Sequence, residues 1–108
     1  MRRLALTILA VAPAVLGAQP TAQNPTNLWL VPLSWRGDKV TVGDPVKLTG
    51  DRGLNSQPAF TPDGRAIVFS ATRDTGRDAR SDIWRLDLES GGERQITRTP
   101  ENENSPTV

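Results

Sequence analysis

From residue 27 onwards the hydrophobic positions fall into short runs, and none of these runs shows the periodicity of an amphipathic helix. The clearest pattern lies at 82–88, where alternation is expected to place Trp84, Leu86 and Leu88 on one face of a strand and Ile83 on the other. Short strands are predicted at 28–33, 40–42, 46–48, 57–60, 66–71, 82–88 and 94–97. The pattern therefore predicts an all-β chain of antiparallel strands joined by tight connections.

A turn with a clear physical basis joins the predicted strands 57–60 and 66–71. Pro62 fixes φ at the second turn position, Asp63 can bond to the local backbone, and Gly64 adopts a conformation that other residues resist. We expect Pro62, Asp63 and Gly64 to be structural turn residues.

Parts of the sequence recur at two related offsets. The stretch that begins at residue 56 starts again at residue 104, an offset of 48, and runs to residue 108. The stretch 27–33 matches 82–88 at an offset of 55, which aligns Trp29 with Trp84. The pair Leu48-Thr49 matches Ile96-Thr97, again at an offset of 48, so the first copy is expected to carry a longer loop at 34–47.

The recurrence predicts the organisation of the chain. It is expected to hold the last two strands of one unit, a whole four-stranded unit at 57–97 and the first strand of a third unit. A period of this length with four strands per unit is typical of radial β-propellers. Residues 27–108 are therefore predicted to form an incomplete propeller of about one and a half antiparallel four-stranded blades.

Three segments carry a resemblance to a known family. They are 58–69, which contains Thr61-Pro62-Asp63-Gly64-Arg65, then 81–87, which begins with Ser81-Asp82-Ile83-Trp84, and then Gln95-Ile96-Thr97. Together they resemble one blade of the WD40-like repeat of TolB-type propellers, with Thr61 in place of the usual serine and Arg65 in place of the usual lysine. The resemblance implies a propeller fold. The resemblance does not imply a single function, because similar blades occur in the periplasmic TolB protein and in propellers attached to prolyl-oligopeptidase-like peptidases.

The first eighteen residues have the layout of a secretory signal peptide. Arg2 and Arg3 precede an apolar run at 4–16, and the small residues Gly17 and Ala18 follow it. The run is too short to span a bilayer core of about 30 Å, so an uncleaved anchor or a buried helix is the weaker alternative. We expect a signal-peptide helix at 1–18, a flexible leader at 19–26, and a periplasmic or secreted chain with no stable membrane anchor after cleavage.

Composition narrows the chemistry. The sequence contains neither Cys nor His, which excludes the usual zinc sites and the Ser-His-Asp and Cys-His catalytic arrangements. Loss of Arg2 and Arg3 with the signal peptide changes the formal net charge from +1 to −1, which argues against nucleic acid as a partner. We therefore expect no enzymatic activity and no catalytic, cofactor or metal site in this chain.

The remaining candidate residues each have two interpretations. Trp29 and Trp84 could stack on sugars, but their equivalent positions in the repeat favour core packing between units. Trp35, in the predicted loop 34–47, is the aromatic most expected to be exposed for binding. Alternating charges at Arg73, Asp74, Arg77, Asp78, Arg80 and Asp82 could bind a ligand or a metal ion, although a solvated, self-neutralising loop is favoured.

Three functions are compatible with these features. The favoured one is an exported, non-catalytic propeller segment that binds other proteins, as the resemblance to TolB implies. The alternatives are the propeller part of a larger exported hydrolase and a truncated product without a function of its own. In each case an isolated unit leaves apolar strand faces unpaired, so the mature chain is also expected to self-associate through these faces.

Overall fold

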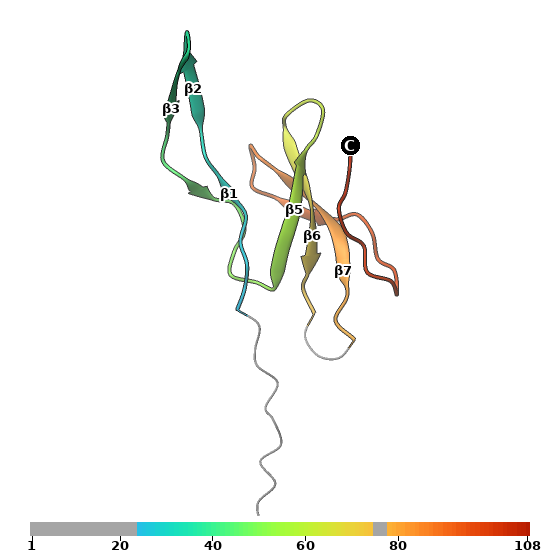
Figure 1. Cartoon of the computed structure of the whole chain (residues 1–108). Coiled ribbons are helices and arrows are strands. Elements are labelled where there is room, and N and C mark those ends of the chain that lie inside the picture. Colours follow the sequence, from blue (N-terminus) through green and yellow to red (C-terminus); the bar gives the residue numbers. More distant parts are fainter. Residues whose placement is uncertain (1–23, 75–77) are drawn as a thin grey trace, which may run out of the picture.

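The computed structural model describes residues 24–74 and 78–108, and this part of the chain contains eight strands and no helix (Figure 1). All paired strands run antiparallel. These findings confirm the all-β class and the antiparallel pairing. The predicted signal-peptide helix at 1–18 and residues 19–23 of the predicted leader lie outside the described residues. At the end of that leader, Thr26 is hydrogen bonded to Gly53 and Asn55.

The largest sheet is an antiparallel meander whose strands lie in the order β5-β6-β7-β8 (Figure 1). Its strands are β5 (Leu54–Phe60), β6 (Ala66–Thr72), β7 (Ser81–Asp87) and β8 (Glu93–Gln95). Strands β6 and β7 pair along their whole length, and Ala66 to Ala71 are all buried because both faces of β6 are covered. This meander matches the predicted four-stranded unit, and we call residues 54–97 the second unit.

Strand β5 begins at Leu54 rather than at the predicted residue 57. The extra residues pair with the end of β6, where Leu54 lies opposite Thr72. The register then shifts between Ser56 and Ala59, where the backbone of Gln57 has a φ of 51°. The predicted strand at 57–60 therefore corresponds only to the second half of β5, from this irregularity onwards.

The preceding residues form two small sheets, with strands at the predicted positions 40–42 and 46–48, but the predicted strand at 28–33 is interrupted and a further strand begins at Leu33. They contain β1 (Trp29–Leu30) paired with β4 (Val46–Lys47), and β2 (Leu33–Arg36) paired with β3 (Lys39–Val42). The predicted strand breaks at Pro32, which has no amide hydrogen to donate. Its carbonyl accepts a hydrogen bond of 2.8 Å from the Gly43 amide, and this bond closes the base of the hairpin.

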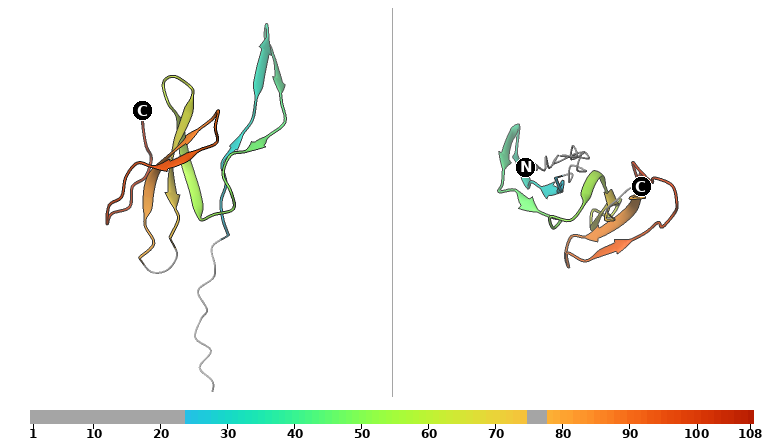
Figure 2. Two further views of the ribbon diagram at one scale, coloured as in Figure 1. Left: turned by 180° about the vertical axis from the view of Figure 1, so that it is seen from behind. Right: turned by 90° about the horizontal axis from the view of Figure 1, so that it is seen from below.

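The hairpin of β2 and β3 turns through two residues, Gly37 and Asp38. Gly37 has a φ of +59°, as the first central residue of a type II′ hairpin turn requires. The hairpin extends away from the four-stranded sheet, and both views of Figure 2 show it at the far side of β1 and β4. The prediction of one long loop at 34–47 is therefore wrong, whereas the strands predicted at 40–42 and 46–48 are confirmed as β3 and β4. We call residues 27–49, which include β1, β4 and this hairpin, the first unit.

The hydrophobic core joins the two units. Ile67, Phe69, Ala71 and Leu86 of the second unit are buried in one cluster with Leu28 of the first unit. Three partly buried side chains pack against this cluster: Leu48, Trp84 and Leu88. As predicted, Trp84, Leu86 and Leu88 face the same core: Trp84 and Leu86 lie in β7, and Leu88 follows its last residue. The first unit therefore covers one face of the four-stranded sheet.

Strand pairing repeats between the two units. Trp29 lies opposite Lys47 in the first unit, and Trp84 lies opposite Gln95 in the second. The two tryptophans are 55 residues apart in the sequence, and their partners, Lys47 and Gln95, are 48 residues apart, which are the two offsets found in the sequence. The pairing of β1 with β4 is thus equivalent to the pairing of β7 with β8.

Hydrogen bonds made by side chains repeat in the same way. The Leu28 amide donates to the Thr49 hydroxyl at 3.0 Å in the first unit. The Ile83 amide donates to the Thr97 hydroxyl at 2.8 Å in the second. Thr49 follows β4 and Thr97 follows β8, and each accepts a hydrogen bond from the amide of the residue that precedes the equivalent tryptophan, Trp29 or Trp84. The sequence match of Leu48-Thr49 to Ile96-Thr97 is therefore also a match of contacts.

An unusual backbone conformation recurs as well. Gln57 and Ser105, with φ values of 51° and 52°, are the non-glycine residues of the described chain with positive φ. They are related by the same offset of 48, and each precedes a proline, Pro58 or Pro106. A residue with a side chain rarely adopts this conformation. Ser105 therefore repeats the backbone conformation that Gln57 has within β5.

Candidate functional site

The turn between β5 and β6 is held by its own side chains. The Thr61 hydroxyl donates a hydrogen bond of 2.6 Å to the Asp63 carboxylate, which also accepts one of 3.0 Å from the Arg65 amide. These two hydrogen bonds hold the pKa of Asp63 below its ordinary value. Gly64, with a φ of +67°, donates its amide to the Thr61 carbonyl at 2.8 Å. The contacts of Asp63 therefore stabilise the turn in which it lies.

Thr61 also connects this turn to the strand that follows. The hydroxyl of this buried residue accepts a hydrogen bond of 3.1 Å from the Ala66 amide. The Thr61 amide donates to the Ala66 carbonyl at 2.9 Å. A serine hydroxyl could make the same contacts, so Thr61 keeps the hydrogen bonds that the serine usual in the TolB-type repeat would make.

The three tryptophans have different environments. Trp84 packs against the core, as predicted, but Trp29 is 58% exposed and lies outside it. The prediction of a core position for Trp29 is wrong for the described chain, because nothing there covers Trp29 as the first unit covers Trp84. Trp35 is 68% exposed and belongs to strand β2 rather than to a loop.

Trp35 lies on an apolar face of the β2–β3 hairpin. Leu33 pairs with Val42 and Trp35 pairs with Val40, so alternation places these four side chains on one face. All four are exposed, and we call them the hairpin face. The opposite face carries the polar residues Ser34, Arg36, Lys39 and Thr41. Four clustered apolar side chains, one of them a tryptophan, are suited to contact an apolar surface of a macromolecule.

The sequence interpretation missed three of the four residues of the hairpin face, namely Leu33, Val40 and Val42. A signal was present, because Gly-Asp between two alternating segments is a strong indication of a two-residue hairpin turn. The position of Pro32 instead suggested the end of a strand. Trp35 was identified from its position in the longer connection and not from its strand.

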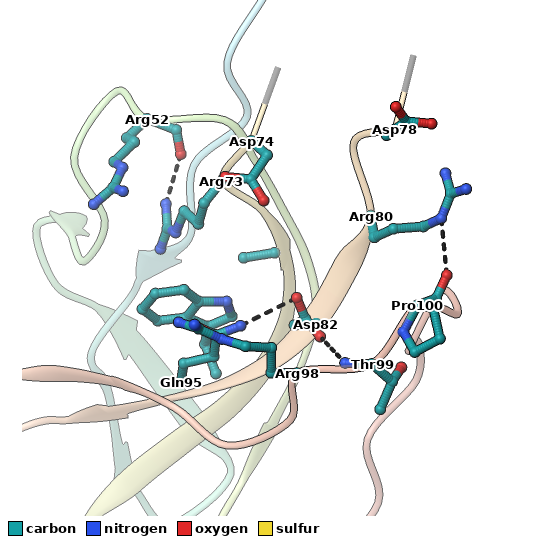
Figure 3. A pocket seen from close by; sticks show the side chains of 12 residues that line it. Arg52, Arg73, Asp74, Asp78, Arg80, Asp82, Gln95, Arg98, Thr99 and Pro100 are labelled. Atoms are coloured by element: carbon teal, nitrogen blue, oxygen red, sulfur yellow. Dashed lines mark hydrogen bonds between the residues drawn. The ribbon is translucent and has the colours of Figure 1, made fainter. Parts of the chain in front are cut away.

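The charged residues that flank the β6–β7 connection line a hollow of about 530 Å³ (Figure 3). Its wall is formed by residues of β6, β7 and β8, by the residues that flank the β6–β7 connection, by Arg52 and by the segment after β8. The side chains that line it are Arg52, Ala71, Arg73, Asp74, Asp78, Arg80, Asp82, Trp84, Gln95, Arg98, Thr99 and Pro100. Both signs of charge are present, so the hollow does not favour anions or cations strongly.

Several of these side chains connect the segments around the hollow. Arg80 donates from Nε to the Pro100 carbonyl at 3.0 Å. The Asp82 carboxylate accepts hydrogen bonds from Gln95 at 3.1 Å and from the Thr99 amide at 3.3 Å (Figure 3). These contacts attach the segment after β8 to the start of β7.

Arg73 is the most buried charge at the hollow, with a side chain that is 6% exposed. Its guanidinium carbon lies 5.1 Å from the centre of the Trp84 ring, within the range of a cation–π contact. Nη1 donates to the Arg52 carbonyl at 2.6 Å, and Nη2 pairs with Glu93 at 2.7 Å. Burial lowers the pKa of Arg73, and the Glu93 carboxylate opposes this shift. These contacts give Arg73 a packing role over Trp84.

Comparisons with known proteins provide no further assignment. The chain matches no protein-family model, no curated protein and no solved structure. Within residues 24–74 and 78–108, no group of three His, Cys, Asp or Glu side chains could hold a metal ion. Among the same residues, no helix is long and apolar enough to cross a membrane.

Proposed function

We propose that this chain is an exported segment of a TolB-type β-propeller, and that it binds other proteins without catalysing a reaction. The observation that supports the propeller best is the recurrence of one set of contacts in both units, at the two offsets found in the sequence. In a propeller, four-stranded blades pack against one another around an axis, so each blade is covered by its neighbours. Leu28 and Leu48 of the first unit cover the second unit in this manner.

The opposite face of the second unit supports the same proposal. Ser70 lies next to Phe69 in β6, so its side chain faces away from the shared core. Gln57 accepts hydrogen bonds from the Ser70 hydroxyl at 3.3 Å and from the Ser105 amide at 2.9 Å. The repeated segment 104–108 therefore begins on the face opposite the first unit. Neighbours on both faces are expected for a blade inside a propeller.

The hairpin face supports a protein as the partner. Its four apolar side chains are exposed, and tryptophan is common among the residues that dominate protein interfaces. The polar residues on the other side of the hairpin keep that side soluble. We propose that Trp35 inserts into an apolar groove of a partner in the cell envelope, with Leu33, Val40 and Val42 packing around it.

Site-specific photo-crosslinking tests the partner. A photoreactive amino acid replaces Trp35 in one variant and Thr41, on the polar face, in a matched control, and both are produced in the organism that encodes the chain. A discrete adduct with another protein is expected from position 35 and not from position 41. Adducts at neither position, or equally at both, would contradict binding through the hairpin face.

Export is tested separately with the full chain. Production with a C-terminal tag in a bacterial host is expected to give a periplasmic product that lacks the predicted signal peptide. Mass spectrometry of the intact product identifies the cleavage site, which is expected after Gly17 or Ala18. An unprocessed chain found only in the cytoplasm would rule out export.

A further inference from the structure

One apolar contact holds the two units together. Leu28 and Leu48 of the first unit pack on the face of the second unit that contains Phe69 and Trp84. We call Leu28 and Leu48 the first cap pair. They are adjacent because the Leu48 amide donates to the Leu28 carbonyl at 2.9 Å. The first cap pair thus covers an apolar face that would otherwise meet water.

The second unit has an equivalent pair. Ile83 and Ile96 are adjacent because the Ile96 amide donates to the Ile83 carbonyl at 2.7 Å, as in the first cap pair. We call Ile83 and Ile96 the second cap pair. Ile83 is half-buried and Ile96 is 49% exposed. The second unit therefore presents a cap pair at the surface of the described chain.

The first unit has an apolar face around Trp29 that is equivalent to the face on which the first cap pair packs. Trp29 is equivalent to Trp84, and alternation along the strand directs its side chain away from Leu28 and from the second unit. Trp29 is 58% exposed, and the nearby Val31 is 42% exposed. By contrast, Trp84 is partly buried, since it packs against the shared core. The described chain thus carries a partly exposed cap pair on one unit and an exposed tryptophan face on the other.

We infer that the chain associates head to tail with a second copy of itself, with Ile83 and Ile96 of one copy packed on Trp29 and Val31 of the next. A second copy fits these two surfaces because the same contact already exists inside the chain, where Leu28 and Leu48 pack in one cluster with Trp84, the equivalent of Trp29. Two different surfaces meet in such a contact, so it extends to further copies unless a ring closes. The inference rests on the repeated contact and does not require a partner on the hairpin face.

The charges around both surfaces specify how the association responds to salt. Arg85 lies directly opposite Arg94, next to the second cap pair. Lys47 lies opposite Trp29 and is paired with Asp51 at 2.6 Å. The residues equivalent to the two arginines, Leu30 and Val46, are half-buried and exposed, so Arg85 and Arg94 lie at the rim of the contact. Because Asp51 neutralises Lys47, strong repulsion between copies is not expected at this rim, and salt is expected to change the association little.

Two complementary variants test the inference. The processed chain is recovered from the periplasm of a bacterial host and studied by analytical ultracentrifugation across a dilution series. Trp29→Lys removes one surface and Ile96→Lys removes the other. Each variant is expected to weaken self-association by about tenfold or more, as the loss of a central interface residue does. An equimolar mixture of the two variants is expected to form a dimer and nothing larger, because each copy retains one complementary surface.

Controls separate this arrangement from other contacts. Val42→Lys alters the hairpin face and is expected to leave self-association unchanged. Circular dichroism verifies the fold of each variant, and if Ile96→Lys unfolds the chain, Ile96→Ser replaces it. Three results would overturn the inference: a wild-type chain that is monomeric at every concentration, an Ile96 variant that associates as well as the wild type, or a mixture that remains monomeric.

Discussion

At the scale of single residues, the turn at 61–65 shows how side chains specify a backbone. The Thr61 hydroxyl bonds to both the Asp63 carboxylate and the Ala66 amide, and Gly64 supplies the left-handed conformation that completes the turn. The roles of Pro62, Asp63 and Gly64 could be predicted because these residue types have strong local preferences. The role of Thr61 was less apparent, since its hydroxyl acts on Ala66, beyond the four-residue turn.

Removing the Thr61 hydroxyl is expected to destabilise the chain. Thr61→Val keeps the shape of the side chain but leaves the buried Ala66 amide without its hydroxyl partner, at an expected cost of about 1–3 kcal/mol in the free energy of unfolding. Thr61→Ser keeps the hydroxyl and is the matched control, with little expected loss. Urea unfolding of both variants makes the comparison. Equal stability of Thr61→Val and Thr61→Ser would show that the hydroxyl is unimportant.

Acid is expected to weaken the fold through its turn carboxylates. The pKa of Asp63 is lowered by the Thr61 and Arg65 hydrogen bonds, and that of Asp87 by hydrogen bonds from the Ser90 amide and hydroxyl. A group with a depressed folded pKa stabilises the fold above its unfolded pKa, here 3.8, and this contribution is lost as the pH falls through the lower folded value. The free energy of unfolding should therefore fall as the pH decreases below about 5.

Asp63→Asn tests this pH dependence at one position. The amide does not ionise in this range, so the decline of stability with acid is expected to be shallower than in the wild type. Denaturant unfolding at a series of pH values measures the two slopes. A variant whose slope equals that of the wild type would exclude Asp63 as a contributor.

At the scale of strands, local pattern predicted the second unit better than the first. The apolar run in β6 and the alternation in β7 correspond to a buried strand and to one with a single core face. The start of β5 was missed because Gly50, Arg52 and Gly53 made the residues before it resemble a turn. Residues 54–56 are held by pairing with β6, a contact between distant segments that local pattern does not contain.

The wrong prediction of a core position for Trp29 also has its cause in contacts between distant segments. Trp29 and Trp84 occupy equivalent positions, and the repeat alone therefore predicted equal burial. Burial instead depends on whether a neighbouring unit covers the residue, and only Trp84 is covered in the described chain. Repeat position thus predicted that Trp29 and Trp84 lie in equivalent strands, but it did not predict their exposure.

The contact between units is expected to contribute strongly to stability. Leu28 is buried in the core of the second unit although it belongs to the first. Leu28→Ala should lower the free energy of unfolding by about 2–5 kcal/mol, as other truncations of buried leucines do. Val46→Ala, at an exposed position in β4, is the control and should change it by less than about 0.5 kcal/mol. Similar losses in both variants would mean that the units do not share a core.

At the scale of the whole molecule, the two units share one hydrophobic core. The first unit covers the second, and residues 104–108 begin on the opposite face of the second unit with the backbone conformation of β5. The described structure leaves a cap pair partly exposed and a tryptophan face exposed. Association with further units therefore follows from the same contact that stabilises the chain internally, and it complements the proposed role in binding other proteins.

The equivalence of the two units is tested most directly by engineered disulfides, because the natural chain has no cysteine that would interfere. Leu30→Cys with Val46→Cys and Arg85→Cys with Arg94→Cys join residues that lie directly opposite each other in equivalent strand pairs. Opposed residues of antiparallel strands lie within the range that a disulfide spans. Register-shifted controls combine Leu30→Cys with Lys47→Cys and Arg85→Cys with Gln95→Cys.

Mass spectrometry after mild oxidation measures which disulfides form within one chain. The repeated architecture predicts that both matched pairs close and that neither shifted pair does. Closure of the Arg85–Arg94 pair alone, or of a shifted pair as readily as a matched one, would contradict the equivalence of the two units.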